Sequence, residues 1–300
     1  MNNPDNIIYR SEFHPHPPLQ VLEFLKYELQ VGRKYVVMVS GEGAEHFGRL
    51  WLKHVNLLCL LEEDKEYHRF IVETLGEQPN LWTAAASLKR MPLDEDSIDS
   101  AVLIGEGFNN TLSSHEITAE LQRCLRLNSY VLGLRHRLTT DTERTFSWAF
   151  SHFFRQYTLG PDHEYDSSPD ENSLGQFFKS GYERKLFPNQ VRLDWDGLQG
   201  YYIASHNALP PDDPKFKWAI KALHILFEQY QTDGEVLLDY QTELYYGLFN
   251  KFVPAISLRK NIFFTLLRPF AFGFYVLVKL NVYFWKMLGK LFRFRVKKRV

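Results

Sequence analysis

The chain has 300 residues, of which 45% are hydrophobic and 24% are charged, values that are ordinary for a soluble protein with one large core or two modest ones. Its two cysteines, Cys59 and Cys124, lie far apart and outside any C-x-x-C pair, which excludes a disulfide framework and favours a reducing cytoplasm. Residues 1–20 contain no apolar run, so no secretory signal is expected there.

The formal net charge of −1 conceals two oppositely charged parts. Residues 251–300 contain 12 of the 35 Lys and Arg and no acidic residue, which gives this tail a charge of +12. The remaining 23 basic residues face all 36 acidic residues in the first 250, which gives that part a charge of −13. This division indicates an anionic partner for the tail alone.

From residue 19 onward, helix-like and strand-like segments alternate at the spacing of a doubly wound α/β sheet. Strands separated by helices of about ten residues need crossover connections, and crossovers make a parallel sheet. The pattern predicts helices over 19–29, 45–54, 64–76 and 115–127, and strands over 35–40, 55–63, 81–87, 97–107 and 129–138.

After residue 139 the sequence becomes rich in aromatic residues. It predicts helices over 144–157 and 216–231, a strand over 235–249, and an exposed loop over 160–173, where periodicity is absent.

A glycine turn follows the first predicted strand. Gly41 and Gly43 would let the backbone approach a ligand at the carboxyl end of that strand, and Glu62 ends the second strand about twenty residues later, where an acid can hold ribose hydroxyls. A tight turn that binds no ligand is the alternative for this motif.

The sequence resembles the class I S-adenosylmethionine-dependent methyltransferases, specifically the bacterial type 11 methyltransferase-domain group, from about residue 9 to 250. The resemblance rests on VVMVSGEGA, LLCLLEEDKEY, SLKRMPLDEDSIDSAVLIGEGF and ELQRCLRLNSYVLGL, and in the second half on FPNQVRLDWDGLQGYYIASHNALP and LHILFEQYQTDGEVLLDYQTELYYGLF. It implies a Rossmann-like α/β sheet with helices on both faces, an elaborated substrate-side second half, and S-adenosylmethionine as cofactor. The cofactor-binding residues implied are Ser40, Gly41, Glu42, Gly43, Glu62, Ser87, Leu88, Gly105 and Glu106.

Several positions depart from the family pattern. Where the family has an acid near the end of the first strand, this chain has Met38 or Val39, and its third loop glycine is Ala44 or Glu45. The family's proline and glycines before the fifth strand are replaced by Leu127, Asn128 and Ser129, and its G-R pair by Gly200 and Tyr201. A methyl transfer depends mainly on alignment, so these changes leave two hypotheses, an active enzyme or a non-catalytic binding or scaffold protein of the same fold.

The eleven histidines, including the H-P-H-P pair His14 and His16, show no metal-ligand spacing, and no metal is expected. By resemblance, His14 and His16 belong to an N-terminal segment that folds over the cofactor cleft. No side chain is nominated as catalytic.

The basic tail is not explained by the resemblance. At about 100° per residue, five further cations fall within about 40° of Arg268 on a helix, while the apolar runs between charges reach only ten residues, against about twenty for an ordinary membrane span. The tail therefore predicts an amphipathic helix lying on an anionic membrane surface, with docking on the protein's own body, a tilted membrane segment and nucleic-acid binding as alternatives. The six cations are Arg268, Lys279, Lys286, Lys290, Arg293 and Lys297.

Together these patterns predict a cofactor-binding core over 1–138, a substrate or lid region over 139–250, and a membrane-associating tail over 251–300. The expected protein is a cytoplasmic methyltransferase held peripherally on the inner membrane face, acting on a small or lipid-like acceptor.

Overall fold

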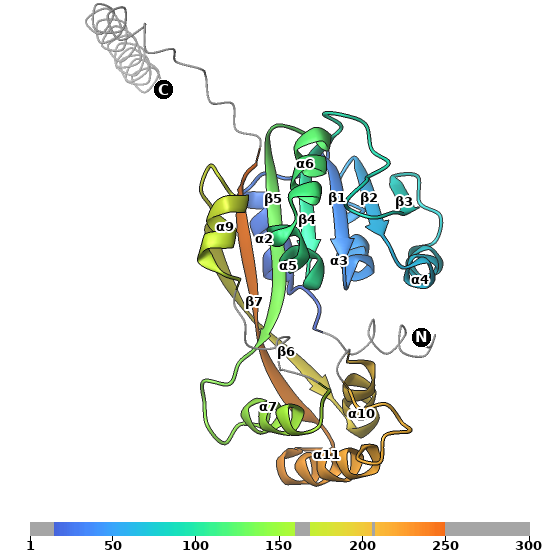
Figure 1. Cartoon of the computed structure of the whole chain (residues 1–300), viewed down its shortest axis with the longest axis vertical. Coiled ribbons are helices and arrows are strands. Elements are labelled where there is room, and N and C mark those ends of the chain that lie inside the picture. The colour runs from blue at the N-terminus through green and yellow to red at the C-terminus, as the bar shows by residue number, and fades with distance from the viewer. Residues whose placement is uncertain (1–14, 160–168, 206–207, 250–300) are drawn as a thin grey trace, which may run out of the picture. The chain divides into compact units, whose positions relative to one another are not determined.

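In the computed structural model, residues 15–159, 169–205 and 208–249 are described, and all of them belong to one compact unit, Met1–Phe252. Its centre is a seven-stranded sheet in the order β3-β2-β1-β4-β5-β7-β6 (Figure 1). β1 to β5 run parallel, whereas β7 is antiparallel to both β5 and β6. The strands are β1 (Val36–Gly41), β2 (Leu57–Glu62), β3 (Leu81–Ala85), β4 (Ile98–Ile104), β5 (Leu125–Leu138), β6 (Glu183–Leu193) and β7 (Val236–Leu248).

Helices cover both faces of the sheet, as expected for strands that are apolar on both sides. In β1, Val37 and Val39 pack in one hydrophobic core, and Met38 packs in the other. The first core receives α2 (Leu19–Tyr27), α3 (Ala44–Trp51) and α4 (Lys65–Leu75). The second receives α5 (Glu106–Ser113), α6 (His115–Cys124) and α9 (Glu171–Phe177).

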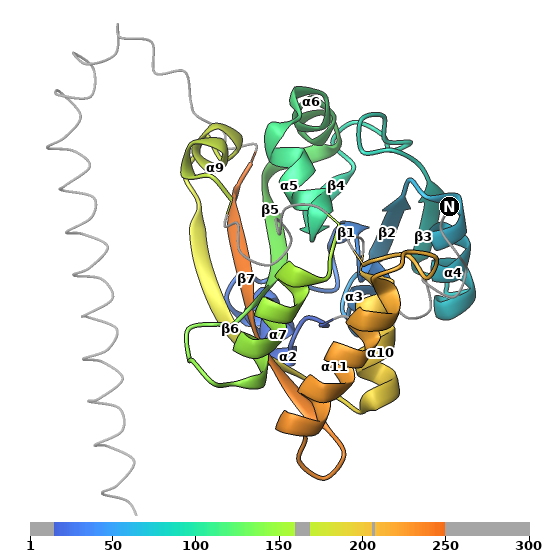
Figure 2. The ribbon, with the colours of Figure 1, turned by 60° about the horizontal axis from the view of Figure 1, so that its bottom comes forward.

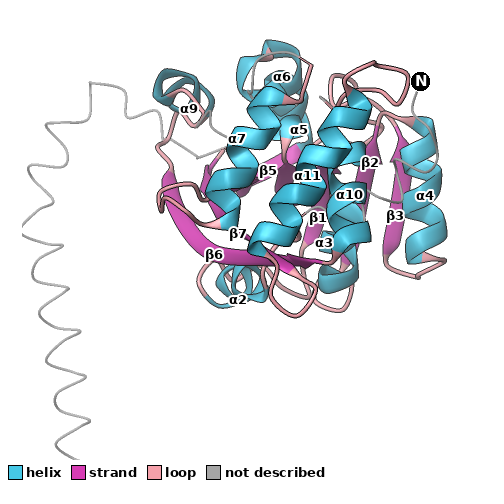
Figure 3. Cartoon of the chain, turned by 90° about the horizontal axis from the view of Figure 1, so that it is seen from below, coloured by secondary structure: helices cyan, strands magenta, loops and turns pink. Residues whose placement is uncertain are grey.

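A third core lies beyond the carboxyl ends of the parallel strands. There β5, β6 and β7 continue past the rest of the sheet and carry α7 (Phe146–Gln156), α10 (Trp195–Ala204) and α11 (Phe216–Tyr230) (Figure 2). Buried aromatic side chains fill this core, among them Phe150, Phe154, Tyr201 and Tyr202. The three helices lie side by side when seen from below (Figure 3), so this second-half structure stands over the edge at which the parallel strands end.

The predicted doubly wound sheet is confirmed, with several local differences. α5 and α10 were not predicted, and the helix predicted over 115–127 ends at Cys124, where β5 begins. The predicted strand over 97–107 ends at Ile104, because Gly105 turns the chain at φ 61° and α5 begins at Glu106. The predicted loop over 160–173 includes the start of α9, which Asp170 caps by accepting the N–H of Ser173 at 3.0 Å. β6 was not predicted at all.

Three of the sequence predictions lie wholly or partly outside the described residues. These are the amphipathic helix of the tail, the placement of His14, and residues 160–168 of the predicted loop.

Candidate active site

A cleft of about 800 Å³ opens at the carboxyl ends of β1, β2 and β3 and beside α5. This is where the chain order in the sheet reverses, because β1 leads to β2 on one side while β4 lies on the other, and such switch points are where open α/β sheets bind ligands. The volume is that of a small-molecule site. Its lining residues are Ser40, Gly41, Glu42, Glu62, Glu63, Asp64, Tyr67, Ala86, Ser87, Leu88, Lys89, Gly107, Asn110, Ser113, Ser114, His115, Glu116 and Ile117.

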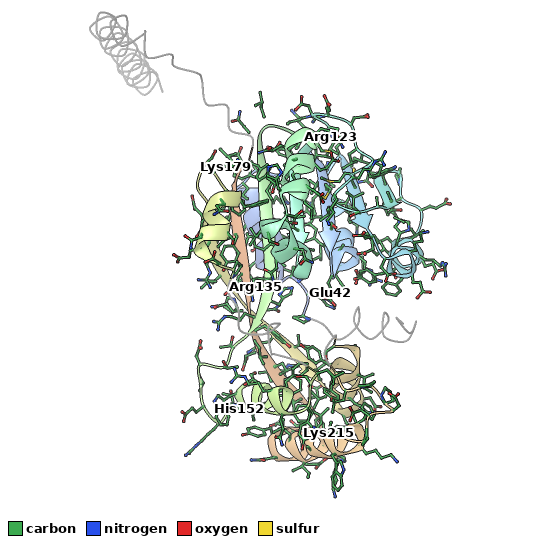
Figure 4. All side chains as sticks on the ribbon, in the orientation of Figure 1. Glu42, Arg123, Arg135, His152, Lys179 and Lys215 are labelled. Atoms are coloured by element: carbon green, nitrogen blue, oxygen red, sulfur yellow. The ribbon has the colours of Figure 1, made fainter. Side chains whose placement is uncertain are left out.

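Six of the nine residues assigned to the cofactor by resemblance line this cleft: Ser40, Gly41, Glu42, Glu62, Ser87 and Leu88. The other three are next to it in the chain. Gly43 is the N-cap of α3, and Glu106 is the first residue of α5. Gly105 lies against Glu42, because a Cβ added at Gly105 would be 3.8 Å from the Glu42 Cβ. The nine residues therefore lie in one region, at the end of the sheet where Figure 4 labels Glu42.

Gly41 is required by its surroundings. It adopts φ 112°, and a Cβ at this position would overlap the backbone carbonyl oxygen of Ile104 on the neighbouring strand. Gly43 has a positive φ of 81° as well, but a Cβ there would meet open space. The two glycines thus have different roles, since Gly41 allows two strands to approach and Gly43 turns the chain into α3.

The glycine loop is held from within the protein by Tyr67 and Glu45. The N–H of Gly43 donates to the Tyr67 hydroxyl at 3.1 Å, and that hydroxyl donates to Glu45 Oε2 at 2.7 Å. Burial raises the pKa of Tyr67, and the neighbouring Glu45 charge raises it further, so the hydroxyl keeps its proton at neutral pH. Glu45 is one of the two candidates for the position of the family's third loop glycine. Its side chain is fully buried and holds the loop through Tyr67.

Sequence reasoning did not identify Tyr67 or Glu45 as site residues. The available signal was that Tyr67 lies in the first turn of the helix after β2, three residues beyond the N-cap Asp64. A first-turn side chain of that helix faces the loop between β1 and α3 only because β1 and β2 are neighbours, which is a property of the sheet order.

Glu62 has the properties expected of an acid that accepts ribose hydroxyls. It ends β2, lines the cleft, and already accepts the N–H of Asp64 at 2.8 Å through Oε1. Burial raises its pKa to about 7, with smaller contributions of the same sign from the charges of Asp64 and Glu63. Donated hydroxyl hydrogens would stabilise the charged carboxylate and lower this pKa.

Met38 and Val39 are both buried in hydrophobic cores, Met38 on the α5 side of β1 and Val39 on the α3 side. The acid typical of the family has therefore no counterpart at either residue. The opposite wall of the cleft is polar instead, with Asn110, Ser113, Ser114 and His115 from α5 and the start of α6, and these were not predicted.

Residues 15–18 reach the beginning of α3. The His16 ring stacks on the His46 ring with centroids 3.3 Å apart, and the His16 carbonyl oxygen accepts from Asn189 Nδ2 at 2.7 Å. His46 Nε2 in turn lies 3.5 Å from Glu45 Oε1. This segment is thus fixed beside the residues that hold the glycine loop.

The described part of the chain lacks two features, a metal-binding cluster and a membrane-spanning helix. Among these residues no three His, Cys, Asp or Glu side chains come together as a metal ion would require. Every helix in the same ranges is too short or too polar to traverse a bilayer.

Comparison with known proteins supports the fold. No protein-family model matches the sequence, and no curated protein sequence matches it. A structure from Anabaena variabilis, assigned as a methyltransferase of an antibiotic biosynthesis pathway, is similar over 80% of this chain and 100% of its own, with 13% identity and a TM-score of 0.53. A structure from Anaeromyxobacter dehalogenans, assigned as a type II methyltransferase, is similar over 79% and 98%, with 10% identity and a TM-score of 0.50.

The chain therefore shares its Rossmann-like α/β fold with these two structures, and at such low identities the likeness establishes the fold alone.

Proposed function

We propose that the protein is an S-adenosylmethionine-dependent methyltransferase acting on a small or lipid-like acceptor, as a divergent member of the type 11 group. The observation that carries this proposal is the cleft at the switch point, with the Gly41 turn on one side and the half-buried Glu62 carboxylate on the other. A turn that exposes backbone and an acid at the end of the next strand are the two features that bind the amino-acid and ribose parts of such a cofactor.

The residues present fit this cofactor. Glu62 lines the cleft, and its carboxylate, which accepts the Asp64 N–H through Oε1, would also accept from ribose hydroxyls. Ser87 and Leu88 follow β3 and would flank the base, while Ser40, Gly41 and Glu42 would border the amino-acid part. When bound, the cofactor supplies an activated methyl group, which the acceptor atom takes as the carbon–sulfur bond breaks and its electron pair stays on sulfur.

The protein's own contribution is alignment. Tyr67 and Glu45 fix the glycine loop, and the helices α7, α10 and α11 stand over the cleft edge and can exclude water from the acceptor. The region 139–250 accordingly acts as the substrate-side lid in this proposal.

The alternative is a non-catalytic binding or scaffold protein with the same fold. Two observations favour it, namely the apolar side chains of Met38 and Val39 and the engagement of the Gly43 N–H by Tyr67 rather than by a ligand.

Titration of the purified full-length protein with S-adenosylhomocysteine in a calorimeter separates the two functions. The methyltransferase proposal expects saturable binding, and no measurable heat at millimolar ligand would overturn it. A Glu62→Ala variant, which removes the ribose acid, is the matched control and should bind more weakly by at least about tenfold.

We further propose that the tail holds the protein peripherally on the inner face of the cytoplasmic membrane. The support is its charge of +12 and the cation stripe from Arg268 to Lys297, which lies outside the described residues.

A further inference from the structure

Four side chains from three strands converge on one buried carboxylate, that of Glu243 in β7. Arg184 Nη2 donates to Glu243 Oε1 at 2.6 Å, and Arg137 Nε lies 3.4 Å from the same oxygen. Arg135 Nε lies 3.7 Å from Oε2, to which the Tyr245 hydroxyl also donates at 3.0 Å. We call Glu243, Arg135, Arg137, Arg184 and Tyr245 the Glu243 cluster.

The register of the sheet places this cluster at the edge where the cleft opens. Gly41 pairs with Ile104, Ile104 with Leu134, and Leu134 with Leu244. The adjacent positions toward the cleft are Glu42 after Gly41, Gly105 after Ile104, Arg135 after Leu134, and Glu243 opposite Arg135. Figure 4 shows Arg135 at the same end of the sheet as Glu42.

The cluster lies across β4 from Glu62, since the strand order runs β2-β1-β4-β5-β7-β6. The Tyr245 ring is 5.8 Å from the ring of Phe108 in α5, the helix whose Gly107 and Asn110 line the cleft. The five residues of the Glu243 cluster do not line the cleft itself. With the cofactor ribose at Glu62, a methyl acceptor that enters beside α5 would lie between the cleft and the cluster.

Three guanidinium groups surround the one buried carboxylate of this cluster. Those of Arg135, Arg137 and Arg184 lie within 3.7 Å of Glu243, and Arg137 also lies 3.9 Å from Asp141, whose side chain is 71% exposed. Burial lowers the pKa of Arg135, which Glu243 counteracts, and the charges of Arg137 and Arg184 lower it further. Only Arg135 is buried in the sheet, whereas Arg137 and Arg184 are partly exposed, and charged groups at such partly open positions are candidates for binding sites.

Arg137 and Arg184 retain donors for a further acceptor. Among the described residues, Arg184 makes one hydrogen bond, to Glu243, and Arg137 makes one, to Gln241 Oε1 at 3.1 Å, out of about five donors in each guanidinium. Their side chains are 41% and 19% exposed, so solvent reaches both. A fixed guanidinium with outward N–H groups binds carboxylate and phosphate oxygens in pairs.

We propose that Arg137 and Arg184, fixed in position by Glu243, bind an anionic group of the methyl acceptor, a carboxylate or a phosphate. This inference rests on the proposed methyltransferase function, and it defines the acceptor as an anion-bearing molecule.

Calorimetric titration of the full-length protein with inorganic phosphate, and separately with acetate, tests the inference, with the protein saturated by S-adenosylhomocysteine. One of the two anions is expected to bind, which distinguishes a phosphate from a carboxylate acceptor. Arg184→Gln and Arg137→Gln are each expected to weaken that binding about tenfold, the effect of losing a charge-assisted hydrogen-bond pair. Arg184→Lys keeps the charge and the fold while removing the paired geometry, and it should weaken binding as well.

Arg192→Gln is the matched control. Arg192 is in β6 like Arg184, its side chain is 72% exposed, and its partner is Glu235 at 3.8 Å, so its replacement should leave anion binding unchanged. Three outcomes would each overturn the inference. The first is that the wild type and both Arg184 variants bind the anion with equal affinity, and the second is that Arg192→Gln weakens binding as much as Arg184→Gln does. The third is that neither anion binds. If saturating S-adenosylhomocysteine abolishes anion binding seen in its absence, the cluster holds the cofactor and the inference is wrong.

The failures of the two proposals are distinguishable. If the protein binds S-adenosylhomocysteine but shows no anion binding that depends on Arg137 or Arg184, the methyltransferase proposal stands and the proposal of an anionic acceptor is wrong. Anion binding at Arg184 without any S-adenosylhomocysteine binding removes the methyltransferase proposal, and with it the assignment of the anion to a methyl acceptor.

Discussion

At the scale of single residues, Glu62 links the cleft to pH. Its pKa of about 7 in the folded protein is above the usual value for a glutamate, so folding favours its protonated form. The contribution of Glu62 to stability is therefore fully present below the unfolded pKa and is lost as the pH rises from about 4.5 through about 7.

Ligand binding should show the opposite trend, because ribose hydroxyls donate to the charged carboxylate. We expect the affinity for S-adenosylhomocysteine to be about tenfold lower at pH 6 than at pH 8, as a proton must leave Glu62 on binding below its pKa. Glu62→Gln should bind weakly at both pH values with little difference between them. A pH dependence that persists in Glu62→Gln would show that Glu62 is not the titrating group.

Tyr67, Glu45 and the Glu243 cluster show why site residues escape sequence reasoning. Gly41 and Glu62 were predicted because a turn glycine and a strand-end acid are local patterns at a known spacing. Tyr67 meets Gly43 across two elements, and Arg184 meets Glu243 from strands 59 residues apart in sequence. No local pattern marks such pairs, because they form only once the strands have taken their order and register.

At the scale of elements, the glycine loop between β1 and α3 is where the fold constrains the sequence most. Gly41→Ala should destabilise the protein by at least about 2 kcal/mol for two reasons. Alanine is strained at the positive φ of this position, and its Cβ would overlap the Ile104 carbonyl oxygen. Urea unfolding followed by circular dichroism measures this change, and binding of S-adenosylhomocysteine should be lost in the same variant.

Gly43→Ala is the matched control for the loop. It has the positive φ without the overlap, so it should cost only about 1 kcal/mol. Equal destabilisation by the two substitutions would show that close packing against β4 is not what requires Gly41.

β6 illustrates an element that its own sequence specifies only in part. Its first four side chains are exposed and Pro188 lies in its middle, although from Phe187 to Leu193 buried or half-buried side chains alternate with exposed ones. It forms because it pairs with β7 along eleven residues at the edge of the sheet. The helices, in contrast, follow from apolar periodicity and caps, as in α4, where Asp64 accepts the N–H groups of Glu66 and Tyr67.

At the scale of the whole molecule, the division of charge leads to a test of the tail. The unit Met1–Phe252 carries the cleft, whereas the cations from Arg268 to Lys297 belong to the unit Val253–Val300. The full-length protein should float with liposomes containing phosphatidylserine, and a variant truncated after Asn250 should remain in the lower fractions. Added salt should weaken the binding, because part of it is electrostatic.

Equal flotation of both proteins would remove the tail as the membrane-binding part. A useful control is liposomes of phosphatidylcholine alone, to which the full-length protein should bind more weakly, because the cation stripe then has no anionic surface to face.

The sequence by itself determined the parallel α/β sheet, the turn at Gly41, the acid at Glu62 and the separation of the basic tail, because these depend on periodicity, spacing and composition along the chain. The tertiary structure decided that Tyr67 and Glu45 hold the glycine loop, that β6 completes the sheet, and that three arginines surround Glu243. The physical reason is that each of these depends on which strands become neighbours and in what register, and burial across the whole molecule selects that arrangement.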